Sequence, residues 1–317
     1  MILTSTTQPA IAAQLHAMGL FTDRPITAQL VPAMASPSWW SADSDCFDIR
    51  ADDSLAPRDA FVKSMIGHAG AYVDIAGSFD AATEAGENGV GPRVLAADAA
   101  AGVLVLENLI DSSSTATLDV FDDDARLEQL LTLRARVHLF GSISRTASVF
   151  DDIRALSALI QANSVPLPKD FGWMMRQLDM AEKRIMATGF DVVPCHGDGN
   201  VSNVLLTDGG DMLLLDWDVA AQMDPLQDIG VMLAEVRSFD GDARAAFEIA
   251  WGTFDQSLFD RARVYGVADC VRWGMVGAYA DTARPGTLEY SKFSDWQFVR
   301  ARAGLGDVHF HDRLRNL

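Results

Sequence analysis

Short apolar runs separated by turn-rich segments fill the first third of the chain. Five of these runs are predicted to be β-strands: residues 26–34, 46–51, 60–66, 93–97 and 102–107. Residues 10–20 carry a weak helical pattern. Residues 71–88 are predicted to form a helix that ends at Gly89-Val90-Gly91-Pro92, because glycine followed by proline is a common helix stop. This part of the chain therefore indicates a small sheet accompanied by helices.

From about residue 122 the apolar positions change to helical spacing. Leucines at 127, 130 and 131 fall near one face, behind three aspartates at the positively polarised helix start. Further helices are predicted over residues 171–188, 229–238, 243–252, 257–265 and 267–279. The remainder of the chain is therefore expected to be mainly helical.

A hairpin interrupts the helical part. Two short apolar runs, residues 204–206 and 212–215, flank a turn that contains two glycines. Such a hairpin folds the chain back and brings Asp216 beside Asn203. Because hard cations such as Mg²⁺ prefer oxygen ligands, we predict Asn203 and Asp216 as magnesium ligands.

Asp198 precedes Asn203 by five residues, the separation between aspartate and asparagine in the protein-kinase catalytic loop. In that loop the aspartate accepts the proton of the substrate hydroxyl. We therefore predict Asp198 as the general base of a phosphoryl transfer, a reaction that depends on positioning and on charge neutralisation by metal. Since Asp-Gly pairs also occur in many loops without catalysis, the prediction depends on the whole set of motifs.

That set resembles a known family. The chain resembles the aminoglycoside phosphotransferase and choline kinase superfamily in four features. They are His196-Gly197-Asp198 with Asn203, the hairpin, Leu215-Asp216-Trp217-Asp218 and the segment at 224–228. Its members are small-molecule kinases with a protein-kinase-like fold. The resemblance implies that ATP and Mg²⁺ are the cofactors, and that Asp228 anchors the catalytic loop. Asp218 is left open between metal binding and an outward-facing structural role.

The same resemblance implies an α+β, bilobal protein-kinase-like fold. Residues 1–108 would form a small antiparallel-sheet lobe that binds the nucleotide, and residues 109–317 a mainly helical lobe that carries catalysis and the substrate site. Glu107 and Leu109 would lie in the hinge between the lobes, where main-chain groups meet the adenine edge.

Lys63 in Phe61-Val62-Lys63-Ser64 resembles the lysine of the third strand, which reaches the nucleotide phosphates. Its acidic partner would lie on the following helix, where Asp74, Asp80 and Glu84 are candidates, and spacing favours Asp80. Two departures from the family stand out. The usual partner is glutamate, and the loop at 35–45 contains no glycine, although backbone approach to phosphates is easiest without side chains.

The amino-acid composition limits the classes of partner that the protein is expected to bind. The 44 acidic and 25 basic residues give a formal net charge of −19, which argues against nucleic acid or an anionic membrane surface as a partner. Cys46, Cys195 and Cys270 lie far apart without metal-ligand spacing, so reduced thiols are expected. With neither a basic and apolar leader nor a long apolar run, the protein is expected to be cytoplasmic, with no membrane partner. The sequence determines neither the oligomeric state nor the choice between ATP and GTP.

The acceptor is predicted to be a small molecule with a hydroxyl group. Aromatic residues gather in the C-terminal part: Trp251, Phe254, Tyr265, Trp273, Tyr279, Tyr290, Phe293, Trp296 and Phe298. Aromatic faces attract ammonium groups, although aromatic residues at helical spacing are more often core. The segments at 224–229 and 291–296, with Arg300, are similar to choline-type relatives, so a cationic choline- or ethanolamine-like acceptor is favoured. An aminoglycoside acceptor, or a nucleotide-binding protein without catalysis, are the alternatives.

Overall fold

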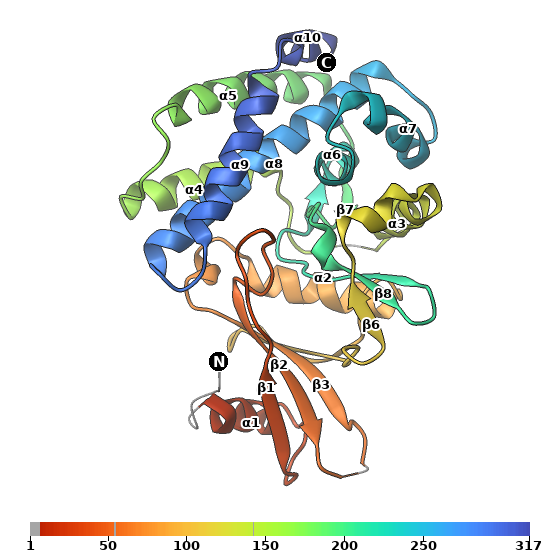
Figure 1. Ribbon diagram of the computed structural model, residues 1–317, viewed down its shortest axis with the longest axis vertical. Coiled ribbons are helices and arrows are strands. Elements are labelled where there is room, and N and C mark those ends of the chain that lie inside the picture. Colours follow the sequence, from red (N-terminus) through yellow and green to blue (C-terminus); the bar gives the residue numbers. More distant parts are fainter. Residues whose placement is uncertain (1–6, 54, 142) are drawn as a thin grey trace.

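The computed structural model describes residues 7–53, 55–141 and 143–317. A lobe built on a five-stranded antiparallel sheet lies below a mainly helical lobe in Figure 1. This arrangement confirms the predicted α+β, bilobal fold. None of the helices in the described part of the chain has both the length and the apolar composition that crossing a bilayer requires.

The sheet has the strand order β1-β2-β3-β5-β4. Its strands are β1 (Ile26–Leu30), β2 (Ser44–Ala51), β3 (Asp59–Met65), β4 (Val94–Asp98) and β5 (Val103–Leu106). Because side chains alternate along a strand, Ala60 and Val62 of β3 enter the core under helix α1 (Thr7–Ala17), whereas Phe61 and Lys63 face the other way. All five predicted strands are present, and the sheet turns Lys63 toward the helical lobe.

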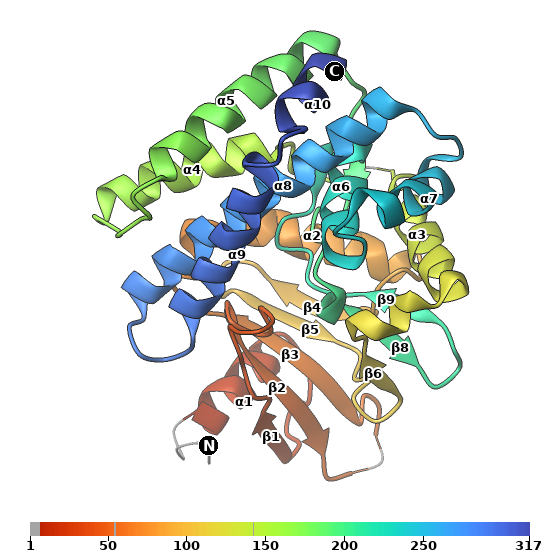
Figure 2. The same ribbon diagram turned by 45° about the horizontal axis from the view of Figure 1, so that its top comes forward.

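Helix α2 (Ile75–Glu87) crosses the sheet between the two lobes (Figure 2). It begins later than predicted because the Asp74 carboxylate caps it, accepting a hydrogen bond from the Gly77 amide at 3.1 Å. A single 3₁₀ turn (Ala69–Ala71) precedes it. Phe79 and Ala82 on its inner face join the core of the helical lobe, so α2 ties the lobes together.

The helical lobe contains α3 (Asp124–Val137), α4 (Val149–Ala162), α5 (Phe171–Thr188), α6 (Pro225–Val236), α7 (Asp240–Trp251), α8 (Gln256–Ala283), α9 (Tyr290–Leu305) and α10 (Phe310–Asn316), with a 3₁₀ turn at Leu118–Asp122. Helix α8 runs through the centre of the lobe, against α4, α6 and α9 (Figures 1 and 2). Helices α9 and α10 were not predicted from the sequence, and neither was α4. Ser148 and Asp151 form a capping box at its start, and that pattern could have revealed it.

The predicted break near residue 266 is wrong, because α8 is one helix of 28 residues. Gly266 is there for packing and not for a turn: a Cβ at this position would lie 2.6 Å from the Gly230 carbonyl oxygen of α6. A Cβ on Gly230 would lie 2.0 Å from the Ala262 carbonyl oxygen. The two glycines therefore let α6 and α8 approach closely.

Two small sheets carry the loops of the site. β7 (Val193–Cys195) pairs with β10 (Ala221–Met223), and β6 (Ser113–Thr115) pairs with β8 (Val204–Thr207), which pairs with β9 (Met212–Leu214). The β8–β9 hairpin confirms the predicted one. The domain boundary proposed after residue 108 falls between β5 and β6 and stays a prediction.

Candidate active site

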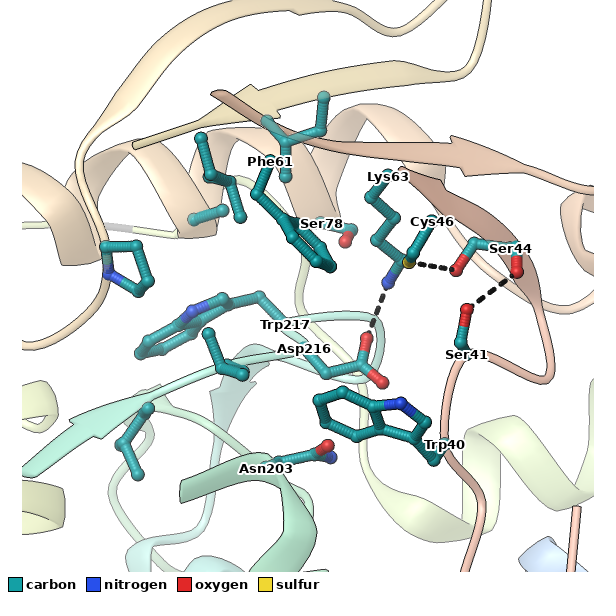
Figure 3. A pocket seen from close by; sticks show the side chains of 16 residues that line it. Trp40, Ser41, Ser44, Cys46, Phe61, Lys63, Ser78, Asn203, Asp216 and Trp217 are labelled. Atoms are coloured by element: carbon teal, nitrogen blue, oxygen red, sulfur yellow. Dashed lines mark hydrogen bonds and ion pairs between the residues drawn. The ribbon is translucent and has the colours of Figure 1, made fainter. Parts of the chain in front are cut away.

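The hairpin brings the two predicted metal ligands together. A 3₁₀ turn (Val201–Asn203) leads into β8, and after β9 the Leu215 amide donates to the Asn203 carbonyl oxygen at 2.8 Å. Asn203, Asp216 and Lys63 consequently line one cavity between the lobes, as Figure 3 shows.

Asp198 lies in the loop between β7 and the 3₁₀ turn and is buried, with 5% of its surface exposed. Its carboxylate accepts hydrogen bonds from the Asn200 amide at 2.9 Å and from Nδ2 of Asn203 at 2.8 Å. Burial raises the pKa of Asp198 to about 7, and the negative charges of Asp216 and Asp269 act in the same direction. A carboxylate poised near neutral pH suits general base catalysis.

Asp228, in the first turn of α6, anchors this loop. Its carboxylate accepts from the Gly197 amide at 2.8 Å and from Nη2 of Arg134 at 2.6 Å, and Nε2 of His138 lies 3.1 Å away. Burial alone would raise the pKa of Asp228, but the charge of Arg134 and these hydrogen bonds hold it well below its usual range. Arg134 also donates to the Asp198 carbonyl oxygen at 2.7 Å, so one buried ion pair fixes the backbone on both sides of the loop.

His196 supports the same loop. Its ring lies against Trp217, with centroids 4.7 Å apart, and Nε2 donates to the Leu215 carbonyl oxygen at 2.8 Å. Burial and the nearby charge of Arg134 lower the pKa of His196 to about 4. The imidazole is therefore neutral near pH 7 and links the catalytic loop to the segment that carries Asp216.

Lys63 pairs with two carboxylates across the cleft. Its Nζ lies 2.6 Å from Asp216 Oδ1 and 2.8 Å from Asp218 Oδ1. Burial would lower the pKa of Lys63, but the two aspartates raise it, so the ammonium stays charged. Lys63 thus connects the sheet lobe to the predicted metal ligand Asp216.

The prediction that Asp80 is the partner of Lys63 is wrong in this structure. Asp80 is exposed on α2, whereas Ser78 occupies the inward position and donates to Asp218 Oδ1 at 2.7 Å. Two residues correspond to more than half a helical turn, which points Asp80 away from the cleft. Asp218 is buried, so the outward-facing role considered for it is also excluded.

The oxygen atoms around Asp216 fit a hard divalent cation. The Asp216 side chain is 25% exposed. Asn203 donates from Nδ2 to Asp198, so its side-chain oxygen Oδ1 remains for another partner. Oδ2 of Asp218 is buried and has no hydrogen-bond donor among the described residues. Amide and carboxylate oxygens around one cavity are the donors that Mg²⁺ selects, so its assignment to Asn203 and Asp216 stays a prediction that this donor set supports.

An apolar slot beside Lys63 is the predicted nucleotide site. Phe61, Leu106 and Leu215 line both the Lys63 cavity and an adjoining cavity of about 410 Å³. Glu107 and Leu109 line the second cavity. The Glu107 carboxylate accepts a hydrogen bond from the Arg93 backbone amide at 2.7 Å, and the Glu107 backbone amide donates to the Arg93 carbonyl oxygen at 2.9 Å. The carboxylate and the amide of Glu107 are therefore already hydrogen-bonded within the sheet lobe. The predicted contacts of Glu107 and Leu109 with adenine stay predictions.

A larger cavity of about 610 Å³ opens on the other side of Asp198. Four aromatic side chains line it: Trp39, Trp273, Phe293 and Trp296. Of the nine aromatic residues considered from the sequence, only those at 273, 293 and 296 line this cavity. Others are core, such as Tyr265, which is buried and donates to Asp224 at 3.0 Å. The structure therefore adds Trp39, a residue of the sheet lobe, to the candidate acceptor site.

Residues 58–267 match the model of the phosphotransferase enzyme family. The chain belongs to this family. The protein is thus a phosphotransferase that acts on hydroxyl groups of small molecules. The sequence matches no curated protein.

Solved structures of small-molecule kinases share the fold of this phosphotransferase. A choline/ethanolamine kinase family protein from Mesorhizobium loti is 19% identical, with a TM-score of 0.76 and coverage of 97% of this chain and 98% of that chain. Choline kinase LicA from Streptococcus pneumoniae is 15% identical, with a TM-score of 0.75 and coverage of 95% and 99%. Spectinomycin phosphotransferase APH(9)-Ia, solved with ADP and spectinomycin, is 15% identical, with a TM-score of 0.59 and coverage of 95% and 99%. At these identities the likeness establishes the fold.

Replacing Asp228 by asparagine in this phosphotransferase should reduce its stability strongly, because Arg134 would remain buried without its counter-charge. Breaking a buried ion pair on one side costs about 3 to 5 kcal/mol. Urea unfolding should therefore show a much lower midpoint. The exposed Asp80→Asn change is the matched control and should stay within about 0.5 kcal/mol of the wild type. Equal midpoints for the two variants would contradict the anchoring role of Asp228.

Proposed function

We propose that the protein transfers the γ-phosphoryl group of ATP, with Mg²⁺, to the hydroxyl of a small cationic acceptor of the choline or ethanolamine type. The observation that carries this proposal is the aromatic cavity of about 610 Å³ beside Asp198. Indole and phenyl faces attract quaternary and primary ammonium groups. An acceptor held there would have its hydroxyl next to the predicted base.

The roles of the residues follow from their positions. Asp198 would orient and deprotonate the acceptor hydroxyl, and Lys63 would hold the nucleotide phosphates. Asn203 and Asp216 would hold Mg²⁺, which neutralises phosphate charge when it is bound. An adenine nucleotide is supported by solved relatives of low identity, since LicA has been crystallised with AMP and APH(9)-Ia with ADP.

The charges of the acceptor cavity favour a monocation over an aminoglycoside with several amines. Besides Asp198, the carboxylates that line the cavity are Glu235 and Asp269. Glu235 lies 3.1 Å from Nη1 of Arg300, and Asp269 forms an ion pair with the buried Arg272. Because each of these two carboxylates already has a guanidinium partner, little uncompensated negative charge remains for a polycation.

A panel of acceptors tests this proposal. Turnover should be measured with choline, ethanolamine, kanamycin and the uncharged isostere of choline in which carbon replaces nitrogen. We expect kcat/KM for choline to exceed that of the isostere by about 10-fold or more, since cation–π contacts contribute roughly 0.5 to 2 kcal/mol each. Kanamycin should be a poor acceptor. A preference for kanamycin, or equal rates with choline and its isostere, would contradict the assignment. Turnover of none of the acceptors would favour a nucleotide-binding protein without catalysis.

A further inference from the structure

Trp39 and Trp40 are adjacent residues that line different cavities. Trp39 lines the acceptor cavity, together with Trp273 and Phe293. Trp40 lines both cavities of the nucleotide side, together with Phe61 and Leu106. The loop between β1 and β2, which lacks glycine, therefore supplies one indole to each side of the site.

Trp39 is fixed on the helical lobe although it belongs to a loop of the sheet. Only 3% of its surface is exposed, and its ring centroid lies 4.8 Å from Phe293, 5.5 Å from Tyr290 and 6.0 Å from Trp273. Its Nε1 donates to the buried carboxylate of Asp43 at 2.7 Å. These contacts hold the indole against α8 and α9 as one wall of the acceptor cavity.

Trp40 lies on the opposite side of the loop. Figure 3 shows its ring between the Asp216 carboxylate and the Asn203 amide in that view, and all three side chains line one cavity. A nucleotide that reached Lys63 and the predicted metal ligands would therefore contact this indole.

The loop is also attached to the catalytic loop near Asp198. The Ser38 hydroxyl hydrogen-bonds with the Ser202 hydroxyl and lies 3.3 Å from Oδ1 of Asn200. Nδ2 of Asn200 donates to the Trp39 carbonyl oxygen at 3.3 Å. The backbone between the two indoles is thereby held next to the predicted base, where the two substrates must meet.

We propose that Trp39 is a specificity-determining residue for the acceptor and Trp40 a contact residue for the nucleotide. The proposal builds on the kinase function proposed above and adds that the sheet lobe takes part in selecting the acceptor. In place of a glycine-rich backbone, this loop presents a flat side chain to each substrate.

Calorimetry with Mg·ADP tests the nucleotide half without any acceptor. Trp40 also lines the cavity that contains Glu107 and Leu109, where adenine is predicted to bind. Trp40→Ala should therefore weaken ADP binding about 10-fold, since aromatic stacking on a base contributes about 1 to 3 kcal/mol. Trp39→Ala and Trp39→Phe should leave it within about 2-fold of the wild type. Trp251→Ala, a change on α7 outside these cavities, is the matched control and should alter neither ADP binding nor turnover. If substitutions at positions 39 and 40 weakened ADP binding equally, the proposed division of roles between the two tryptophans would be overturned.

Steady-state kinetics with choline, or with the best acceptor of the panel, tests the acceptor half. Trp39→Phe keeps a ring in the buried site and should raise KM for the acceptor about 5-fold or more, with KM for ATP unchanged, because phenyl attracts cations less than indole does. Circular dichroism verifies that each variant is folded. An unchanged acceptor KM in folded Trp39→Phe would refute the specificity role. If the wild type phosphorylates no acceptor, the proposed function fails, and the ADP measurement still decides whether the two tryptophans differ toward the nucleotide.

Discussion

Asp198→Asn should nearly abolish phosphoryl transfer while leaving the binding of Mg·ADP almost unchanged. The amide keeps the size of the buried side chain, but it cannot accept the proton of the acceptor hydroxyl. General base catalysis contributes roughly 10²- to 10⁴-fold, so kcat should fall within that range. Steady-state turnover and ADP calorimetry on the same preparation measure the two quantities.

The interpretation of Asp198→Asn requires that the catalytic loop keeps its shape. Asp228 and Arg134 hold the backbone on both sides of residue 198, so thermal unfolding should differ little from the wild type. Asp80→Asn is again the matched change, because Asp80 is exposed on α2, and this variant should retain full activity. Full activity in Asp198→Asn would show that another group accepts the proton.

Asp216→Asn should remove the dependence of nucleotide binding on Mg²⁺. In the wild type, ADP affinity should rise when Mg²⁺ is added, whereas the variant should bind ADP with similar affinity in both conditions. Loss of charge stabilisation by metal, worth several kcal/mol, should lower kcat/KM for ATP on the order of 10³-fold. Lys63 would keep its ion pair with Asp218, so this ion pair should still join the two lobes across the cleft.

A neighbouring carboxylate provides the control for Asp216→Asn. Asp211 lies in the same β8–β9 hairpin and is exposed, so Asp211→Asn should preserve the magnesium dependence. An Asp216→Asn variant that still bound ADP more tightly with Mg²⁺ would exclude Asp216 as a metal ligand.

Much of the fold followed from local patterns in the sequence. The strands of the five-stranded sheet and the β8–β9 hairpin were predicted because alternation and turn residues act over a few positions. The anchor Asp228 was also predicted, through the resemblance to a family whose loop it supports. In each of these cases the residues that determine the element lie within it or in a motif of fixed spacing.

The features that were missed depend on contacts between distant segments. From the sequence, Gly266 was interpreted as a break between two helices. Its role in the structure is to let the Gly230 carbonyl group of α6 lie close to α8. Asp80 was favoured over Asp74 and Glu84, and Ser78 was not considered, because the rotation of α2 about its axis, which decides the inward residue, is set by packing against the helical lobe. Trp39 was not assigned to the acceptor site from the sequence, since nothing local places it against Trp273.

The central claim is that the protein moves the γ-phosphoryl group of ATP onto the hydroxyl of a small molecule. Phosphorus NMR of a reaction that contains the protein, Mg·ATP and choline tests this claim directly. We predict that phosphocholine and ADP form in equal amounts, and that Asp198→Asn forms both roughly 10²- to 10⁴-fold more slowly. Formation of ADP and inorganic phosphate without a phosphorylated acceptor, across the whole acceptor panel, would contradict it.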